Sequence, residues 1–138
     1  MTATVEEIGR LRRMVSEPGA DTYSDSELQG YIQRYPVVDG RGESPWVEST
    51  TTPGTLALND DWTATYDLNA AAADVWSEKA GLAAANYDFE TQGQGFSRSQ
   101  AYEQAIGQAR YYRSRRNAQT RRMRPEPRDT EMSEDLSN

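Results

Sequence analysis

The segment from residue 68 to residue 87 constrains the fold of this chain more than any other part of the sequence. Apolar residues recur along it at the spacing of one helix face, and alanines fill much of the remaining surface. We therefore expect a helix about 30 Å long, with Asp67 as its N-cap. Because alanine is small, other helices can approach closely, which is typical of the central helix of a bundle. Its predicted apolar stripe comprises Leu68, Ala72, Val75, Trp76, Ala80, Ala83 and Tyr87.

Three further helix starts carry the Ser/Thr-x-x-Glu/Gln capping box, in which two side chains satisfy unpaired backbone N–H groups. The boxes are Thr4–Glu7, Ser24–Glu27 and Ser97–Gln100. They predict helices from Val5 to about Val15, from Asp25 to Arg34 and from Arg98 to about Arg122. In the first helix, Val5, Ile8, Leu11 or Arg12, and Val15 should share one stripe, and in the last one Ala101, Tyr102, Ala105, Ile106, Ala109 and Tyr112 should face a core.

These patterns predict a mainly α protein, a small bundle of about four helices, two of them long, with an extended C-terminal tail. Residues 1–122 would form the helical domain and residues 123–138 a flexible or partner-ordered tail. The second half of the last helix is mostly arginine and polar residues, so we expect it to project into solvent or a partner.

Residues 36–66 are rich in proline and glycine and show no sustained period. We expect a long irregular loop here, with possible short strands at Val37-Val38 and at residues 55–58. A loop of this length in a small domain is usually functional or ordered by a partner. The glycine-bearing residues 88–96 predict a second connection, an exposed loop or small hairpin.

Large apolar residues are scarce in this chain. Leucine, isoleucine, valine and phenylalanine together supply 18 of the 138 residues, below the roughly 20 % under which chains struggle to bury a core. The composition therefore predicts a chain that stays partly disordered or completes its core with neighbouring molecules.

The residues that are absent exclude several kinds of chemistry. The chain has no cysteine and no histidine, which excludes thiolate nucleophiles, disulfides, Cys/His zinc sites and imidazole bases. Gly93-x-Gly95 lacks the third glycine of a dinucleotide-binding motif, and residues 95–99 lack the last glycine of a nucleophile elbow. Asn59-Asp60-Asp61 is more typical of a turn or cap than of a calcium site. We expect no enzyme activity, no cofactor and no metal.

No apolar run reaches the length of a membrane span, and the first residues do not resemble a secretion signal. The sequence therefore predicts a soluble chain that is made in the cytoplasm and has no membrane partner.

Charge is divided sharply along the sequence. Residues 1–97 carry a net charge of −10, residues 98–124 a net charge of +7 and residues 125–138 a net charge of −4. An acidic body with a basic helix and an acidic tail is dipolar, and dipolar subunits associate readily head to tail.

The basic segment 110–124 interleaves arginines with Tyr111 and Tyr112, and three interpretations of it remain open. It could bind nucleic-acid phosphates, it could be a solvated helix face, or it could dock onto an acidic protein surface. Overall acidity weighs against DNA, and the guanidinium fork pairs well with carboxylates. Docking onto a protein is therefore the favoured hypothesis, and a nucleic-acid-binding regulatory or packaging protein is the alternative.

The three tryptophans also allow two interpretations. Trp62 and Trp76 fit ordinary core anchors, whereas Trp46 fits an interface anchor that is ordered on assembly.

The stretch DWTATYDLNAAAADVW from Asp61 to Trp76, the segment Gly81–Asp88, the sequence FSRSQ from Phe96 to Gln100 and the helix Ala101–Arg116 resemble head-to-tail connector proteins of tailed bacteriophages. These proteins are also called adaptor or head-completion proteins. The resemblance covers residues 4 to about 120 in element order and local sequence. The long segment 36–66 departs from the family pattern.

This resemblance implies a structural subunit of the virion neck that forms a ring, dodecameric in the family, beneath the portal protein. Such a ring extends the channel for genomic DNA, without sequence-specific contacts, and provides the platform for a stopper or tail-completion protein. The portal-facing residues implied by position are Tyr111, Tyr112, Arg113, Arg115, Arg116, Arg121, Arg122 and Arg124. The residues implied at ring or neck interfaces are Trp46, Phe89 and Phe96, within or beside the loops 36–66 and 88–96.

Overall fold

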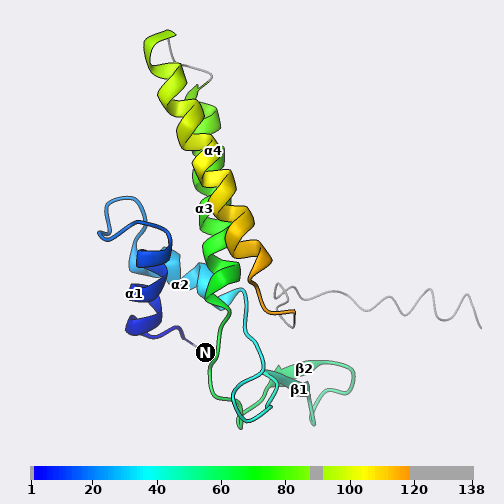
Figure 1. Ribbon diagram of the computed structural model, residues 1–138. Helices are drawn as coiled ribbons and strands as arrows, with labels where there is room; N and C mark the ends of the chain where they lie inside the picture. Colours follow the sequence, from blue (N-terminus) through cyan, green and yellow to red (C-terminus); the bar gives the residue numbers. More distant parts are fainter. Residues whose placement is uncertain (1, 88–91, 119–138) are drawn as a thin grey trace, which may run out of the picture.

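The computed structural model describes residues 2–87 and 92–118, except for the side chains of residues 86, 87 and 92–98. Within these ranges the chain forms four helices and one two-stranded sheet (Figure 1), which confirms the expected mainly α class. The elements are α1 (Val5–Met14), α2 (Asp25–Gln33), β1 (Trp46–Glu48), β2 (Leu56–Leu58), α3 (Leu68–Tyr87) and α4 (Gln92–Ser114). The expected boundary near residue 122 and the tail 123–138 lie outside the described residues.

Helices α3 and α4 form a long antiparallel hairpin that is the axis of the molecule (Figure 1). We call the end where α3 begins and α4 ends the base, and the opposite end the tip. Near the base, Ala70 to Ala73 are at most 2 % exposed, and Ala105 and Ala109 are buried on α4. Small side chains allow the two helices to pack closely, as the alanine content predicts.

Both ends of α4 differ from the prediction. The helix begins at Gln92, so Ser97 lies inside it and the third capping box is wrong. It ends at Ser114 and not near Arg122. The reason is tertiary: beyond the helix, the Asn117 amide donates to Asp67 Oδ2 at 2.5 Å, and Asn69 Nδ2 donates to the Arg115 carbonyl at 3.4 Å.

The Arg-rich second half expected for this helix runs to residue 122, and residues 119–122 lie outside the described residues. In its described part Arg110, Tyr111 and Arg113 are exposed. Ala105, Ala109 and the half-buried Tyr112, which were expected to face the core, do so on one face of α4. The part of the hairpin toward the tip stands free of α1 and α2 (Figure 1). There Ala101 is exposed, Tyr102 is 40 % exposed and Leu82 is 51 % exposed. The first half of α4 therefore extends beyond the body, and the expectation that Ala101 and Tyr102 face a core is wrong.

The first capping box is confirmed in full, and of the second only the N-cap contact of Ser24 is present. Thr4 Oγ1 accepts the Glu7 amide hydrogen, and Glu7 Oε1 accepts the Thr4 amide hydrogen, which completes the box. Ser24 Oγ accepts the Glu27 amide hydrogen at 3.1 Å. Val5 is 87 % exposed and does not belong to the buried stripe of α1. The fully buried residues Leu11, Val15, Leu28, Ile32 and Val75 join α1, α2 and α3 in one core.

The carboxyl end of α1 is held by side chains from the hairpin. Trp76 Nε1 and Tyr112 Oη both donate to the Met14 carbonyl, at 3.1 and 3.2 Å. Lys79 Nζ donates to the Val15 carbonyl at 2.7 Å and pairs with Glu17 at 2.8 Å. The last carbonyls of a helix lack partners within the helix, so these contacts fix α1 to α3 and α4.

Arg12 holds the connection between α1 and α2. Its side chain is 11 % exposed, and its guanidinium donates to the carbonyls of Glu17, Gly19 and Tyr23. It also pairs with Asp25 at 2.6 Å. One guanidinium group thus binds four acceptors in a turn that contains few apolar side chains.

The segment 36–66 is folded against the base by its own residues. Trp62 Nε1 donates to the Val37 carbonyl at 2.9 Å, and the Trp62 ring meets the Tyr66 ring edge-on at 5.9 Å between centroids. Trp62 and Trp76 are buried, as expected for core anchors. Of the two expected strands, residues 56–58 are confirmed as β2, whereas Val37-Val38 is not a strand; Pro36 forms a single bridge with Tyr66. The strand β1 was not expected.

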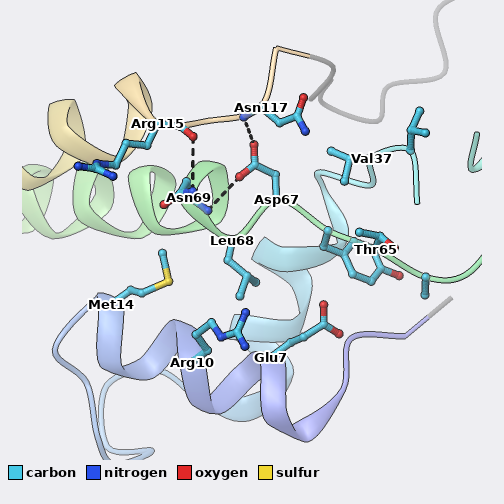
Figure 2. A pocket seen from close by; sticks show the side chains of 13 residues that line it. Glu7, Arg10, Met14, Val37, Thr65, Asp67, Leu68, Asn69, Arg115 and Asn117 are labelled. Atoms are coloured by element: carbon cyan, nitrogen blue, oxygen red, sulfur yellow. Dashed lines mark hydrogen bonds between the residues drawn. The ribbon is translucent and has the colours of Figure 1, made fainter. Parts of the chain in front are cut away.

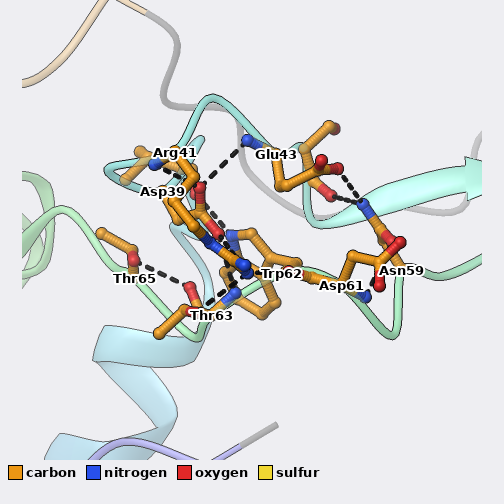
Figure 3. Close-up of polar contacts among 10 residues, drawn as sticks. Asp39, Arg41, Glu43, Asn59, Asp61, Trp62, Thr63 and Thr65 are labelled. Carbon is orange, nitrogen blue, oxygen red and sulfur yellow. Dashed lines mark hydrogen bonds and ion pairs between the residues drawn. The ribbon is translucent and has the colours of Figure 1, made fainter.

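Asp39 organises this segment (Figure 3). Its carboxylate, 2 % exposed, accepts the backbone N–H groups of Thr63, Arg41 and Glu43 at 2.8 to 3.0 Å. The Thr63 amide in particular lowers the pKa of Asp39, and the other two amides and the Arg41 charge act in the same direction. Nearby, Asn59 Oδ1 accepts the Asp61 amide hydrogen, which makes residues 59–61 the turn that the sequence favoured.

We predict that Arg12→Gln lowers the free energy of unfolding by about 2 kcal/mol, because three carbonyls, two of them in part-buried contacts, and the Asp25 carboxylate lose a charged donor. Arg12→Lys should keep part of this free energy of unfolding, because a single ammonium group keeps the charge but lacks the guanidinium fork. Urea unfolding followed by circular dichroism measures the difference. The control is Arg13→Gln, at an exposed position of the same helix, with an expected effect within about 0.5 kcal/mol. Equal effects at both positions would contradict the role given to Arg12.

We also predict that Asp39→Asn speeds hydrogen exchange of the Thr63, Arg41 and Glu43 amides at pH 7. Because the pKa of Asp39 is lower in the folded chain than in the unfolded one, its carboxylate stabilises the fold above the unfolded pKa of about 3.9. This stabilisation is lost as the pH falls through the folded pKa. In the unsubstituted chain, exchange at these amides, corrected for its intrinsic pH dependence, should therefore rise below about pH 4, and the variant should lack that rise. Asp60→Asn, at an exposed neighbouring position, serves as the control and should leave the three amides unchanged.

Candidate interaction surface

The basic end of α4 presents its arginines to solvent while the helix itself is packed. Arg110, Tyr111, Arg113, Arg115 and Arg116 are all exposed. The Arg115 guanidinium lies over the Tyr111 ring, 4.6 Å from its centroid, and the Arg116 guanidinium lies 5.5 Å from the Tyr35 centroid. Stacking on an aromatic ring holds a guanidinium in place while leaving its N–H donors available.

Two of the residues assigned to a partner contact also have internal roles. Tyr112 is half-buried and binds the Met14 carbonyl, and burial raises the pKa of its hydroxyl. Arg113 donates to Ser77 Oγ at 2.9 Å. The Tyr112 hydroxyl therefore anchors α4, and the exposed Tyr111 is the tyrosine that a partner can reach.

A cavity of about 690 Å³ lies at the base, between α1, the first turn of α3 and the residues that follow α4 (Figure 2). We call it the basal cavity. Segments 37–38 and 64–66 complete its wall. Its lining includes the apolar residues Met14, Val37, Val38 and Leu68 and the charged residues Glu7, Arg10, Asp67 and Arg115.

The charges around the basal cavity are unequally satisfied. Glu7 accepts the Thr4 amide hydrogen at 2.9 Å, and Asp67 accepts those of Asn69, Ala70 and Asn117. By contrast, no carboxylate of residues 2–87 or 92–118 forms an ion pair with Arg10 or Arg115. The cavity thus combines an apolar wall with two guanidinium groups that have no carboxylate partner in the described chain.

Tyr66 lines the same cavity, and its hydroxyl is buried without a hydrogen-bond partner among the described residues. Burial raises the pKa of this hydroxyl, and the nearby Glu7 carboxylate raises it further. A buried donor without an acceptor costs stability, so the ring of Tyr66 stabilises the fold and its hydroxyl does not.

The remaining sequence-predicted site residues are scattered. Trp46 lies half-buried on β1, and Phe96 lies within α4 and not in a loop. Phe89, Arg121, Arg122 and Arg124 lie outside the described residues. The structure therefore brings together Tyr111, Arg115 and Arg116 at the base, and it does not bring Trp46 to the same surface element.

Two further apolar surfaces are exposed. In the antiparallel pair β1–β2, Trp46 faces Leu58 and Glu48 faces Leu56, so these four side chains share one face of the ribbon. Leu56 is 69 % exposed and Leu58 is 42 % exposed. The second surface is the tip of the hairpin, with Leu82 and Tyr102.

The described part of the chain contains no group of three or more carboxylate side chains placed to hold a metal ion. Among its helices, none combines the length and the apolar character that a membrane crossing requires.

Comparison of the chain with models of protein families, with curated proteins and with solved structures finds no match in any of the three.

Sequence reasoning missed Arg10 and Asp67 as residues of the candidate surface. Arg10 lies in the predicted helix 5–15 without a motif that marks it, and the sequence indicates for Asp67 only the role of an N-cap. No local signal reveals the cavity, because its lining comes from four separate parts of the chain.

We predict that Tyr66→Phe leaves stability unchanged or raises it by about 1 kcal/mol, because it removes a buried donor without an acceptor. The matched control is Tyr112→Phe, which loses the bond to the Met14 carbonyl and should lose about 1 kcal/mol. Thermal unfolding of both variants measures the contrast in sign. A clear loss of stability in Tyr66→Phe would show that its hydroxyl has a partner.

Proposed function

We propose that this chain is a non-enzymatic structural adaptor, a head-to-tail connector subunit of a tailed bacteriophage that forms a ring below the portal. The observation that carries the proposal is that the core of the described residues lies at the base of the hairpin. The core joins α1, α2 and the basal halves of α3 and α4, while apolar residues at the tip and on the ribbon remain exposed. A ring subunit needs such surfaces because its neighbours cover them.

The charge distribution supports the same proposal. The basic end of α4 offers exposed arginines suited to carboxylates of a portal protein, and the body is acidic. An acidic channel wall repels the phosphates of genomic DNA and lets the DNA pass without sticking. The ribbon and the tip would contact neighbouring subunits or a stopper protein. Because the chain resembles connector proteins, we expect the ring to contain twelve subunits.

Electron cryomicroscopy of a particle neck tests the proposal directly. We expect the chain as a ring between the portal and the tail. Its location in the capsid shell, or its absence from the virion, would refute the proposal. If the purified chain instead binds DNA tightly with a steep salt dependence in a mobility-shift titration, the alternative of a nucleic-acid-binding regulator would replace it.

We predict that Arg113→Glu combined with Arg116→Glu weakens co-sedimentation with the cognate portal by about tenfold or more, because reversed charges repel an acidic partner surface. Neither residue lines the basal cavity. Arg13→Glu, on an exposed face of α1, is the control and should bind portals normally. A truncation from residue 111 is a poorer test, because it also removes the contacts of Tyr112 and Asn117 within the body. Normal portal binding by the double variant would show that another surface docks.

A further inference from the structure

We propose that the basal cavity is a binding site for the acidic segment 125–138 of the same chain. This assignment goes beyond the adaptor function and does not depend on it. Its occupant is an anionic peptide with apolar side chains, and the acceptor site is the cavity wall together with Arg10 and Arg115.

The two guanidinium groups of the cavity are the groups that an anion would contact. Both carboxylates in its lining are engaged by backbone amides. The two guanidinium groups have no carboxylate partner within residues 2–87 and 92–118. Arg115 is held over the Tyr111 ring, and the Arg10 side chain extends from α1 toward Leu68 (Figure 2). An incoming carboxylate therefore meets cations that lose no existing ion pair when they bind it.

The apolar wall requires more than a simple anion. Met14, Val38 and Leu68 are all partly exposed at the cavity. An occupant that covers them must carry apolar side chains as well as negative charge. Segment 125–138 has a net charge of −4 and contains Met132 and Leu136 among its acidic residues, so its composition matches both parts of the site.

Chain connectivity places this segment within reach. Asn117 itself lines the cavity, and the last described residue, Ala118, follows it directly. The six residues 119–124 can span up to about 20 Å when extended, which is enough for a return to the cavity. Tethering by a short linker gives an effective concentration of about millimolar, so a weak site of this kind is occupied within one molecule.

Occupation of the cavity by this segment has a consequence for the basic end of α4. Acidic residues held at Arg10 and Arg115 lower the positive potential around Arg116 and Arg113. A polyanion or an acidic partner then competes with the segment for this surface. The acidic segment thereby restricts the basic end to partners that displace it.

The test uses the full chain and a fluorescein-labelled peptide of residues 125–138, followed by fluorescence anisotropy. A tail-neutralised full chain carries Glu126→Gln, Asp129→Asn, Glu131→Gln, Glu134→Gln and Asp135→Asn, which removes competition from its own segment. We expect this chain to bind the peptide at least about tenfold more tightly than the unsubstituted chain. Adding Arg10→Gln and Arg115→Gln should weaken binding by about tenfold or more, whereas Arg13→Gln should not change it. Circular dichroism confirms that each variant is folded.

Four results would overturn the proposal. No binding to the tail-neutralised chain removes the site, and binding that ignores Arg10 and Arg115 places the peptide elsewhere. Equal binding to the unsubstituted and tail-neutralised chains, or competition that varies with protein concentration, shows that the segment does not occupy the cavity of its own molecule. None of these measurements involves a portal or DNA, so their failure is separate from failure of the adaptor function.

Discussion

The carboxylate of Asp67 fixes both ends of the α3–α4 hairpin at the base of the molecule. One oxygen accepts the amides of Asn69 and Ala70 and begins α3, and the other accepts the Asn117 amide after α4 has ended. The Asp67 amide in turn donates to the Tyr35 carbonyl at 2.9 Å, just beyond α2. The start of one helix, the end of another and the exit of a third therefore share one residue.

Around Asp67 a small apolar core is sufficient to hold the fold, because polar contacts also connect the helices and the segment 36–66. Trp76, Lys79 and Tyr112 bind the last carbonyls of α1, Arg12 binds those of the α1–α2 turn, and Asp39 gathers the amides of segment 36–66. Buried polar groups stabilise a fold only when they are satisfied. The scarcity of large apolar residues is thus compensated at the base, and the tip and ribbon remain uncovered.

This arrangement places unlike surfaces at separate positions. The apolar tip and the apolar face of the ribbon suit neighbours that exclude water, whereas the basic end of α4 and the basal cavity suit carboxylates. A subunit in an assembly needs such a division, because each partner then recognises a different chemistry. The same division leaves Arg115 of the basal cavity close to where the described chain leaves the base.

The sequence by itself determined the elements whose signals are local. A cap acts over two or three residues, so Thr4, Ser24 and Asp67 fixed the starts of α1, α2 and α3, and the ends of these helices were predicted within one residue. The exposed arginines at the end of α4 were also predictable from their run in the sequence. The Ser97 box was wrong because α4 continues through it, so a local cap pattern does not by itself mark a helix start.

Only the tertiary structure decided the course of segment 36–66, the end of α4 and the basal cavity. The contacts responsible join distant residues: Thr63 to Asp39 over 24 positions, Trp62 to Val37 over 25, and Asn117 to Asp67 over 50. No periodicity or motif encodes such a pair, because each partner taken alone is an ordinary polar or aromatic residue. These pairs form only when the packing of the whole chain brings the two residues within hydrogen-bond distance.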